Sequence, residues 1–313
     1  QVAFDFTGPL DTAGHWAYRL IGVYRDSDSQ IDHVPDDRKA IAPSITWMPD
    51  ADTRWTLLAN FQFDHNGTSL NFLPHAGTLL PNPNGRIDTR RFVSEPGFDR
   101  YDTQQRSFTS LFEHRFNDTW KFVQNMRYSH DNVDYRSLYP DVYSNPSYPF
   151  LDESQRTVAR YSYVSIDRHK RFVTDTHAEA DFDLASMHHR VLIGLDVGYS
   201  HTDSRQGNGF DGVPFDLYAP VYGNGFVAPD IFPVASSHTR QTGVYVQDQI
   251  NWGEHWIATV GLRHDRATLT TGDSRSVDNA TTSRFGVMYR FDNGLVPYVS
   301  YTESFQPLDS LDF

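Results

Sequence analysis

Apolar and polar side chains alternate at every second position along much of this chain. Between Trp55 and Phe63 the odd positions are apolar and the even positions are polar, with Leu58 as the only exception. Three further segments repeat the pattern, at residues 120–128, 189–199 and 283–291. A period of two predicts β-strands with one apolar and one polar face, and no segment stands out with a helical period.

The alternation predicts twelve strands. They are expected at residues 1–6, 15–26, 38–49, 53–65, 104–116, 119–131, 157–184, 188–203, 238–252, 255–270, 281–291 and 295–305. Most exceed the roughly 9–11 residues that a tilted strand needs to cross a bilayer. Residues 157–184 also fit two separate strands, but one long strand preserves a strict alternation of short and long connections along the chain.

The connections between these strands alternate in length. Short ones are expected at 50–52, 117–118, 185–187, 253–254 and 292–294, with a modest one at 7–14. Long ones are expected at 27–37, 66–103, 132–156, 204–237 and 271–280. Up-and-down barrels of the bacterial outer membrane have this pattern, with short periplasmic turns and long extracellular loops.

All six tryptophans lie within a few residues of an expected short turn, and none lies in a long connection. They are Trp16, Trp47, Trp55, Trp120, Trp252 and Trp256. Tryptophan favours the membrane–water interface, because its ring is amphipathic. The core of a soluble β-sandwich gives no reason for all six to choose one end. We therefore expect an all-β, antiparallel, up-and-down transmembrane β-barrel.

Composition excludes several other classes of protein. The chain has 313 residues and a net charge of −13 (27 Lys and Arg against 40 Asp and Glu), whereas nucleic-acid-binding domains need a basic surface. It has no cysteine, which excludes disulfide scaffolds, zinc ribbons, iron–sulfur clusters and thiol catalysis. Its mean hydropathy is −0.56 although aromatic residues reach 14%. A membrane barrel explains both values, because only alternate residues meet lipid.

Motifs along the whole chain carry a family resemblance. They are FDFTGPLD (4–11), YRL (18–20), IAPS (41–44), LP (73–74), GT (77–78), FND (116–118), QNMRY (124–128), TGVYVQDQ (242–249), GLRHD (261–265) and GLVPYVSYTESFQP (294–307). In this order and spacing, the chain resembles the barrel of TonB-dependent siderophore receptors, and most closely the ferrichrome-receptor type.

The resemblance implies a barrel of about 22 strands around an N-terminal plug domain that is preceded by a TonB box. Residues 1–313 are then one partial barrel domain, about 12 of those strands, with the plug domain and the C-terminal strands absent. Twelve strands cannot close at the radius of 22, and open sheet edges are not tolerated in lipid. We therefore expect a fragment of a larger receptor.

The resemblance also implies three siderophore contacts. Phe72 precedes the Leu-Pro-x-x-Gly-Thr motif at a position where the family has an aromatic contact, while Leu70 replaces the neighbouring one. Tyr139 matches a contact in the loop after the Gln-Asn-x-Arg-Tyr strand, but Asp141 stands where a second tyrosine is expected, and Tyr143 follows two residues later. Phe210 is the nearest candidate for a third contact. Packing between loops is the alternative role for all three.

The sequence offers one candidate for a metal site and none for catalysis. An acidic ladder shares one strand face with His177, at Asp175, Glu179, Asp181 and Asp183. Its oxygens suit Ca²⁺, but a solvated wall facing the plug is the simpler interpretation. No nucleophile elbow, Walker loop, dinucleotide fingerprint or HExxH motif is present. We expect no enzyme, no catalytic residue, no metal site and no cofactor.

The expected function is uptake of a ferric siderophore of the hydroxamate, ferrichrome-like type across the outer membrane of a Gram-negative bacterium. The expected partners are the siderophore, the TonB–ExbB–ExbD system acting through the N-terminal region, and outer-membrane lipid or lipopolysaccharide, with no nucleic acid. The alternatives are another TonB-dependent cargo (a catecholate siderophore, cobalamin or a glycan), a passive porin, and a secreted all-β binding module.

Overall fold

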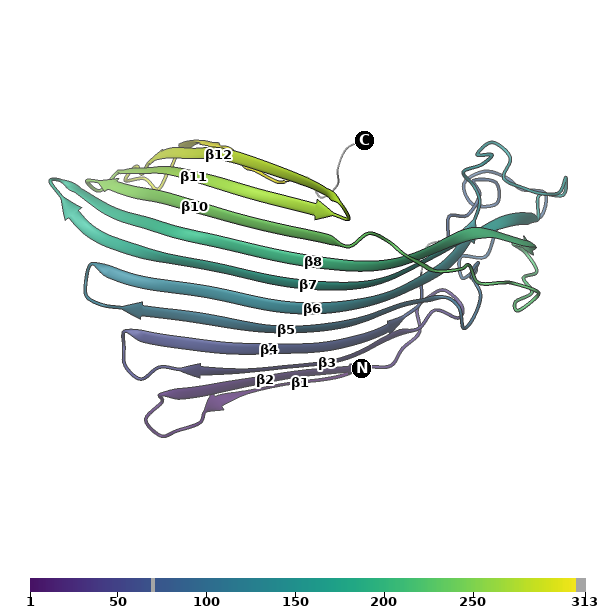
Figure 1. The fold of residues 1–313 in the computed structure, drawn as a ribbon, viewed down its shortest axis with the longest axis horizontal. Coiled ribbons are helices and arrows are strands. Elements are labelled where there is room, and N and C mark those ends of the chain that lie inside the picture. The colour runs from purple at the N-terminus through teal and green to yellow at the C-terminus, as the bar shows by residue number, and fades with distance from the viewer. Residues whose placement is uncertain (69–70, 308–313) are drawn as a thin grey trace.

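The computed structural model describes residues 1–68 and 71–307 as one antiparallel sheet (Figure 1). Leu70 lies outside the described residues. The strands are β1 (Val2–Pro9), β2 (Trp16–Arg25), β3 (Asp36–Trp47), β4 (Thr53–Asn66), β5 (Arg100–Arg115), β6 (Trp120–Pro140), β7 (Thr157–Leu184), β8 (Met187–Asp216), β9 (Phe232–Pro233), β10 (Ser237–Trp252), β11 (Trp256–Thr271), β12 (Ser274–Tyr289) and β13 (Tyr298–Thr302). Neighbours in sequence are neighbours in the sheet, except that the short β9 pairs only with β8.

The sheet is curved, and the connections sort by length to its two ends, except that the two-residue turn between β11 and β12 lies at the end of the long loops. In Figure 1 the short turns lie on the left and the long loops gather on the right. We call these the short-turn end and the long-loop end. Among the described residues, no helix is long and apolar enough to cross a membrane.

All twelve predicted strands are present, and the long strand 157–184 is confirmed as β7. Two strands extend further than predicted, β6 to Pro140 and β8 to Asp216. The predicted long connection at 271–280 is wrong, because a two-residue turn at 272–273 joins β11 to β12 there. In all three places the strand continues without an alternating apolar face, so the hydrophobic period gives no signal.

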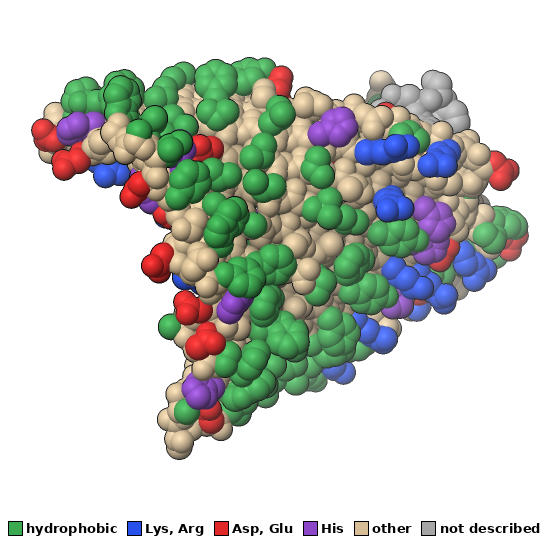
Figure 2. Space-filling view, turned by 60° about the vertical axis from the view of Figure 1, so that its left-hand side comes forward, with side chains coloured by type: hydrophobic (Ala, Val, Ile, Leu, Met, Phe, Trp, Pro, Cys, Tyr) green, Lys and Arg blue, Asp and Glu red, His purple; other side chains and the backbone are tan. Residues whose placement is uncertain are grey.

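The register assigns every strand residue to one of two faces, because directly paired residues share a face. The apolar face includes Trp55 and Phe61 of β4, and Ile193 and Val197 of β8. The polar face includes Asp175 of β7 and the residues paired with it. Ile193 is 54% exposed, so no other part of the described chain covers this face at that height. Figure 2 shows hydrophobic side chains spread over the sheet, with Lys and Arg gathered towards one end.

The six tryptophans all lie at the short-turn end of their strands, as predicted. Trp16 pairs with Trp47, and Trp47 pairs with Trp55, so three indole rings stand side by side on β2, β3 and β4. Trp252 and Trp256 face each other across the β10–β11 turn. The rings form an aromatic belt along one rim of the apolar face, which is the arrangement expected at a membrane interface.

Candidate functional site

An aromatic row crosses three strands near the long-loop end. The register pairs Tyr139 of β6 with Tyr161 of β7, and Tyr161 with Phe210 of β8. The ring centroids are 5.7 Å apart in the first pair and 5.1 Å apart in the second. Phe72, from the connection between β4 and β5, packs edge-on against Tyr139 at 5.3 Å. The structure thus brings Phe72, Tyr139 and Phe210 into one aromatic row, joined through Tyr161.

The aromatic row lies on the polar face of the sheet. The pairing of β6 with β7 runs without interruption from Trp120 to Pro140, so alternate residues keep their face along the whole strand. Tyr161 and Asp175 are fourteen residues apart in β7, an even number, and therefore share that face. The row stands above the polar wall and away from the exposed apolar face.

Phe72 has a strained backbone. Its φ angle is 34°, in the left-handed region that a bulky side chain rarely adopts. Its ring is 38% exposed although it contacts both Tyr139 and Tyr143. Strain of this kind persists where the surrounding structure enforces it, and it concentrates at functional sites. The conformation holds the Phe72 ring against the row with one side open.

The connection that carries Phe72 is closed at its base by Asp99. The Asp99 carboxylate accepts hydrogen bonds of 2.6 Å from both the backbone N–H and the hydroxyl of Thr68. The Thr68 hydroxyl is also 2.9 Å from that of Ser137. Burial raises the pKa of the Asp99 carboxyl above its usual value, and the hydrogen bonds from Thr68 oppose this shift.

A buried arginine ties the loops together behind the row. Arg160 of β7 is 1% exposed, and its guanidinium lies 2.5 Å from Asp211 and 2.8 Å from Glu95. Its centre stacks 4.5 Å from the Phe215 ring. The second oxygen of Glu95 accepts a hydrogen bond of 2.7 Å from the Gly223 N–H. The charged cluster of Arg160, Asp211 and Glu95 therefore joins the β4–β5 connection and the β8–β10 connection to the β7–β8 hairpin.

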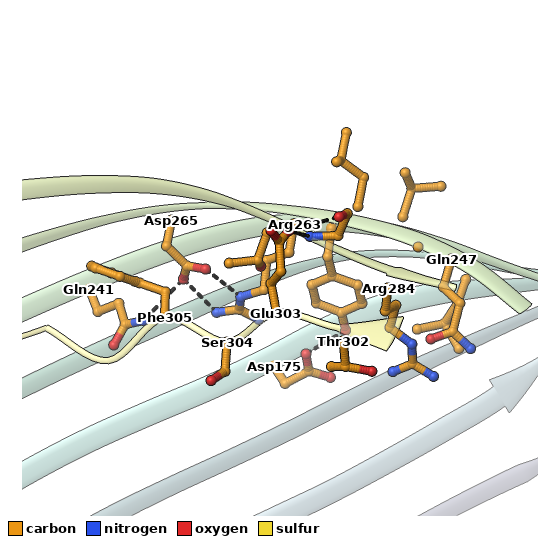
Figure 3. A pocket seen from close by; sticks show the side chains of 17 residues that line it. Asp175, Gln241, Gln247, Arg263, Asp265, Arg284, Thr302, Glu303, Ser304 and Phe305 are labelled. Atoms are coloured by element: carbon orange, nitrogen blue, oxygen red, sulfur yellow. Dashed lines mark hydrogen bonds and ion pairs between the residues drawn. The ribbon is translucent and has the colours of Figure 1, made fainter. Parts of the chain in front are cut away.

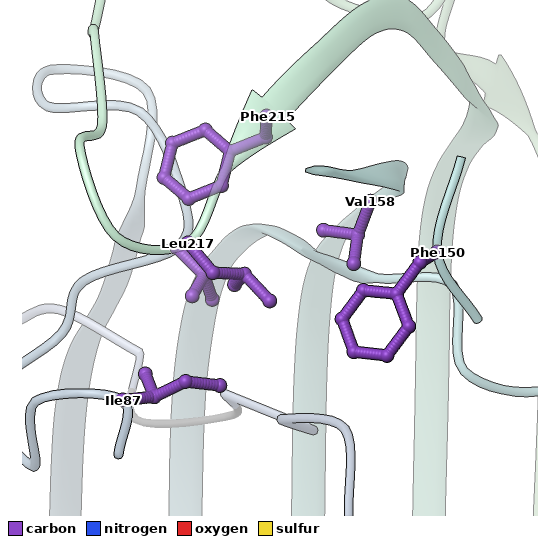
Figure 4. Packing of buried hydrophobic residues seen from close by; sticks show 6 residues of the cluster. Ile87, Phe150, Val158, Phe215 and Leu217 are labelled. Carbon is purple, nitrogen blue, oxygen red and sulfur yellow. The ribbon is translucent and has the colours of Figure 1, made fainter. Parts of the chain in front are cut away.

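Apolar packing completes this junction (Figure 4). Ile87 and Val93 come from the β4–β5 connection, Leu217 from the β8–β10 connection, and Val158 and Phe215 from β7 and β8. Tyr222 donates a hydrogen bond of 2.9 Å to the Phe92 carbonyl, and burial raises the pKa of its hydroxyl. The loops therefore have their own core, which holds the aromatic row in place.

A hollow lies lower on the polar face than the aromatic row, beneath residues 302–305 (Figure 3). Its volume is about 520 Å³. Arg263 donates two hydrogen bonds of 2.7 Å to Asp265, which also accepts one from Gln241. Tyr245 donates one of 2.5 Å to Asp175. These groups satisfy one another, so this hollow has the character of a polar wall.

The acidic ladder lies where the sequence predicted it. Asp175 is 2.7 Å from His177, and Glu179 is 3.5 Å from it. Glu179 also lies 3.9 Å from Lys121 of the neighbouring strand. Across residues 1–68 and 71–307, no group of three or more His, Cys, Asp or Glu is placed to hold a metal ion.

Sequence reasoning missed Tyr161 as a member of the row. The residue falls in a strand that the alternation predicted, but its partners depend on the register of two hairpins. Tyr143, the tyrosine found out of place in the motif, packs against Phe72 at 5.7 Å. A register derived from the short turn after Leu184 would have paired Tyr161 with Phe210. The pairing of Tyr139 with Tyr161 spans the long connection between β6 and β7, so no short turn fixes it.

Comparison with known proteins places the chain in a class that agrees with this geometry. The family "TonB dependent receptor-like, beta-barrel" matches residues 46–313. The chain therefore belongs to the TonB-dependent receptor barrels of the outer membrane, as its motifs led us to expect.

Individual relatives are receptors and transporters. The ferrioxamine B receptor of Salmonella typhimurium is 33% identical over 321 residues, covering 99% of this chain and 43% of the relative. The ferrichrome outer membrane transporter/phage receptor of Escherichia coli K12 is 34% identical, covering 98% and 44%. The chain thus spans less than half the length of these relatives. None of them is named as an enzyme, in line with the expectation of a non-enzymatic role.

Solved structures share the fold at low identity. The ferric-catecholate import receptor Fiu of E. coli K12 superposes with a TM-score of 0.81 at 18% identity, covering 96% of this chain and 47% of that one. The ferripyoverdine receptor of Pseudomonas aeruginosa gives 0.79 at 18% identity, covering 98% and 41%. These likenesses confirm the barrel architecture.

Proposed function

We propose that the protein is an outer-membrane receptor that captures a ferric siderophore of the hydroxamate type and passes it inward with energy delivered through TonB. The observation that carries this proposal is the aromatic row on the polar face, assembled from Phe72, Tyr139, Tyr161 and Phe210. Two relatives that cover nearly the whole chain are named for ferrioxamine B and for ferrichrome.

The chemistry of the row suits such a cargo. Iron in a hydroxamate complex is already fully wrapped in oxygen ligands, so the receptor meets an organic shell of modest polarity. Aromatic rings give that shell a large contact area and lose little rotamer entropy. A few polar groups among them set orientation. Phe72 and Phe210 supply the apolar contacts, while Tyr139 combines a ring with a hydroxyl.

The proposed mechanism divides the work between barrel and partners. Residues 1–313 act as part of the barrel domain, wall the path and supply part of the binding surface. A plug domain covers the path, and TonB, energised by ExbB and ExbD, rearranges that plug after the siderophore has bound. The barrel residues only hold the cargo and exclude water from it, so no bond is made or broken.

Outer-leaflet lipid is the second proposed partner. We call a row of directly paired residues on neighbouring strands a rung. One rung across the apolar face carries five cationic or titratable side chains. The rung consists of Arg106, His130, Lys170, His201 and His238. It lies on the long-loop side of the exposed Ile193 and Val197, where the phosphates of lipopolysaccharide would meet the protein. Cations at this height favour anionic headgroups.

A binding titration tests the proposed cargo. The purified receptor is titrated with a ferric trihydroxamate, a ferric catecholate and cobalamin. We expect affinity for the hydroxamate, with Phe72→Ala weakening it about tenfold because a central aromatic contact is lost. Phe98→Ala serves as the matched control. Phe98 packs on Phe226 at 4.8 Å and lies outside the row, so its loss should change affinity less than about twofold.

Each alternative function has its own outcome. Binding of the catecholate or cobalamin without the hydroxamate would reassign the cargo. Open-channel conductance in planar bilayers without TonB would identify a passive porin. Equal losses of affinity in Phe72→Ala and Phe98→Ala would indicate that the aromatic row packs the loops together and does not bind the siderophore.

A further inference from the structure

A second aromatic line runs just below the row on the same polar face. Tyr101 of β5 pairs directly with Tyr135 of β6, and their ring centroids are 5.5 Å apart. Tyr135 lies 5.9 Å from Tyr163 of β7, which is two residues from Tyr161 and therefore on its face. The row and this line together form a tyrosine-rich wall two tiers deep.

The charge on this wall is unusually low for a polar face. Four successive rungs across β6, β7 and β8 place three residues each on the polar face, one from each strand and twelve in all (4 × 3). They are Val133, Tyr135, Ser137 and Tyr139; Tyr161, Tyr163, Ser165 and Asp167; and Ser204, Gln206, Asn208 and Phe210. Asp167 is the single charged residue among them.

Asp167 carries its negative charge without a cationic partner on these rungs. Its oxygens accept hydrogen bonds from Ser165 at 2.8 Å and from Ser204 at 2.5 Å. The nearest basic side chains on this face stand further down, at His169 on the next rung and at Arg171 beyond it. A ligand resting on the wall therefore meets neutral hydroxyls, amides and one carboxylate.

We propose that this two-tier wall selects ferric complexes by charge, accepting neutral or cationic hydroxamates and rejecting anionic ones. This inference rests on the proposed function and extends it from cargo class to cargo charge. The hydroxyls of Tyr161 and Tyr163 donate hydrogen bonds to the oxygen-rich shell of the complex. No basic side chain on the twelve positions offsets the negative charge of a catecholate-type complex, and Asp167 repels it.

One ligand series isolates charge from shape. A ferric trihydroxamate with a free terminal amine is cationic, its N-acetyl derivative is neutral and its N-succinyl derivative is anionic, while the iron core stays the same. The intact receptor is titrated with all three at low ionic strength. We expect the cation and the neutral complex to bind at least about fivefold more tightly than the anion.

Variants then assign the selectivity to the wall. Asp167→Asn should reduce the discrimination against the anion by about threefold or more, and Asn208→Lys should reduce it further, because it adds a cation among the tyrosines. Asp118→Asn makes the same charge change in the exposed turn at the opposite end of the sheet and should leave the series unchanged. Tyr161→Phe should weaken all three ligands by a similar factor, because it removes a hydrogen bond whatever the ligand charge.

The outcomes separate this inference from the proposed function. Tight binding of the anion by the unmodified receptor, or an equal effect of Asp118→Asn and Asp167→Asn, would overturn charge selection while leaving hydroxamate uptake intact. Failure of all three complexes to bind would overturn the proposed function, and the inference with it. Each variant is first checked for folding by its heat-modifiable electrophoretic mobility.

Discussion

Arg160 shows how single residues hold the loops over the sheet. Its guanidinium reaches two carboxylates and a ring, and it is almost fully buried. No sequence pattern predicts this role, because Glu95 and Asp211 lie 65 and 51 residues away from it. Phe72, by contrast, was predicted as a site residue from its place in a motif. Its contact with Tyr139 could not be derived, because it depends on a loop that folds back on its neighbour.

Removing Arg160 should release the loops. Arg160→Ala leaves Glu95 and Asp211 buried without their cation, which costs about 3–5 kcal/mol of local stability. We expect proteases to cleave the 67–99 connection much faster in this variant while the barrel strands stay intact. Arg190→Ala is the control, because its ion pair with Asp181 is exposed and should contribute less than about 1 kcal/mol. Cleavage at the unmodified rate in Arg160→Ala would contradict this role.

Asp99 should make loop closure dependent on pH. The pKa of its carboxyl is raised in the folded state, so folding favours the protonated form. Closure therefore weakens as pH rises from the pKa of this carboxyl in the unfolded chain towards its higher pKa in the folded protein. Two single cysteines, Leu79→Cys and Val227→Cys, allow spin labels on the two exposed connections. Their distance distribution should narrow as pH falls from 7 towards the ordinary range of an aspartate carboxyl, about 4, in the otherwise unmodified protein, and this response should disappear in Asp99→Asn. The same response in both proteins would exclude Asp99 as its source.

At the scale of elements, alternation predicted which strands exist but not how far they run. Strands that cross the membrane keep an apolar face, so their period of two is visible in the sequence. Beyond that zone, β6 and β8 continue without an apolar face for lipid, and their residues Asn132–Pro140 and Ser204–Asp216 resemble a loop in the sequence. The turn at 272–273 was missed for the same reason. Gly272 has φ +56° there, a conformation that glycine adopts without strain.

A glycine in β8 shows how neighbouring strands fit together. A Cβ atom on Gly194 would stand 2.3 Å from the Tyr245 ring of β10, which leans across it. Gly194→Val should push this ring away and break its hydrogen bond to Asp175, destabilising the sheet by about 1–3 kcal/mol. Gly198→Val is the matched control on the same strand and face, where the nearest side-chain atom is 3.9 Å from the added Cβ. Equal shifts in the thermal unfolding of the two variants would contradict this close fit.

At the scale of the whole molecule, the sheet has one face for lipid and one for water. The tryptophans mark one rim of the apolar face, and the cationic rung through Lys170 marks its other side. The loop core and the aromatic row lie beyond that rung, so the proposed cargo site stands outside the hydrocarbon zone. This division explains why the strands and their two faces could be predicted from sequence, since both depend on periodic features, whereas the family followed from motifs in a fixed order. The contacts of the site depend on tertiary packing and required the structure.

The two faces of β8 give the most direct test. The chain has no cysteine, so single-cysteine variants at residues 191–197 can each carry one fluorophore without background labelling. The labelled receptor is placed in bilayers of brominated lipid, which quenches fluorophores that touch hydrocarbon. We predict strong quenching at the odd positions, including Ile193 and Val197, and weak quenching at the even positions, including Asp196. Quenching without a period of two, or strongest at the even positions, would contradict the assignment of the apolar face to lipid.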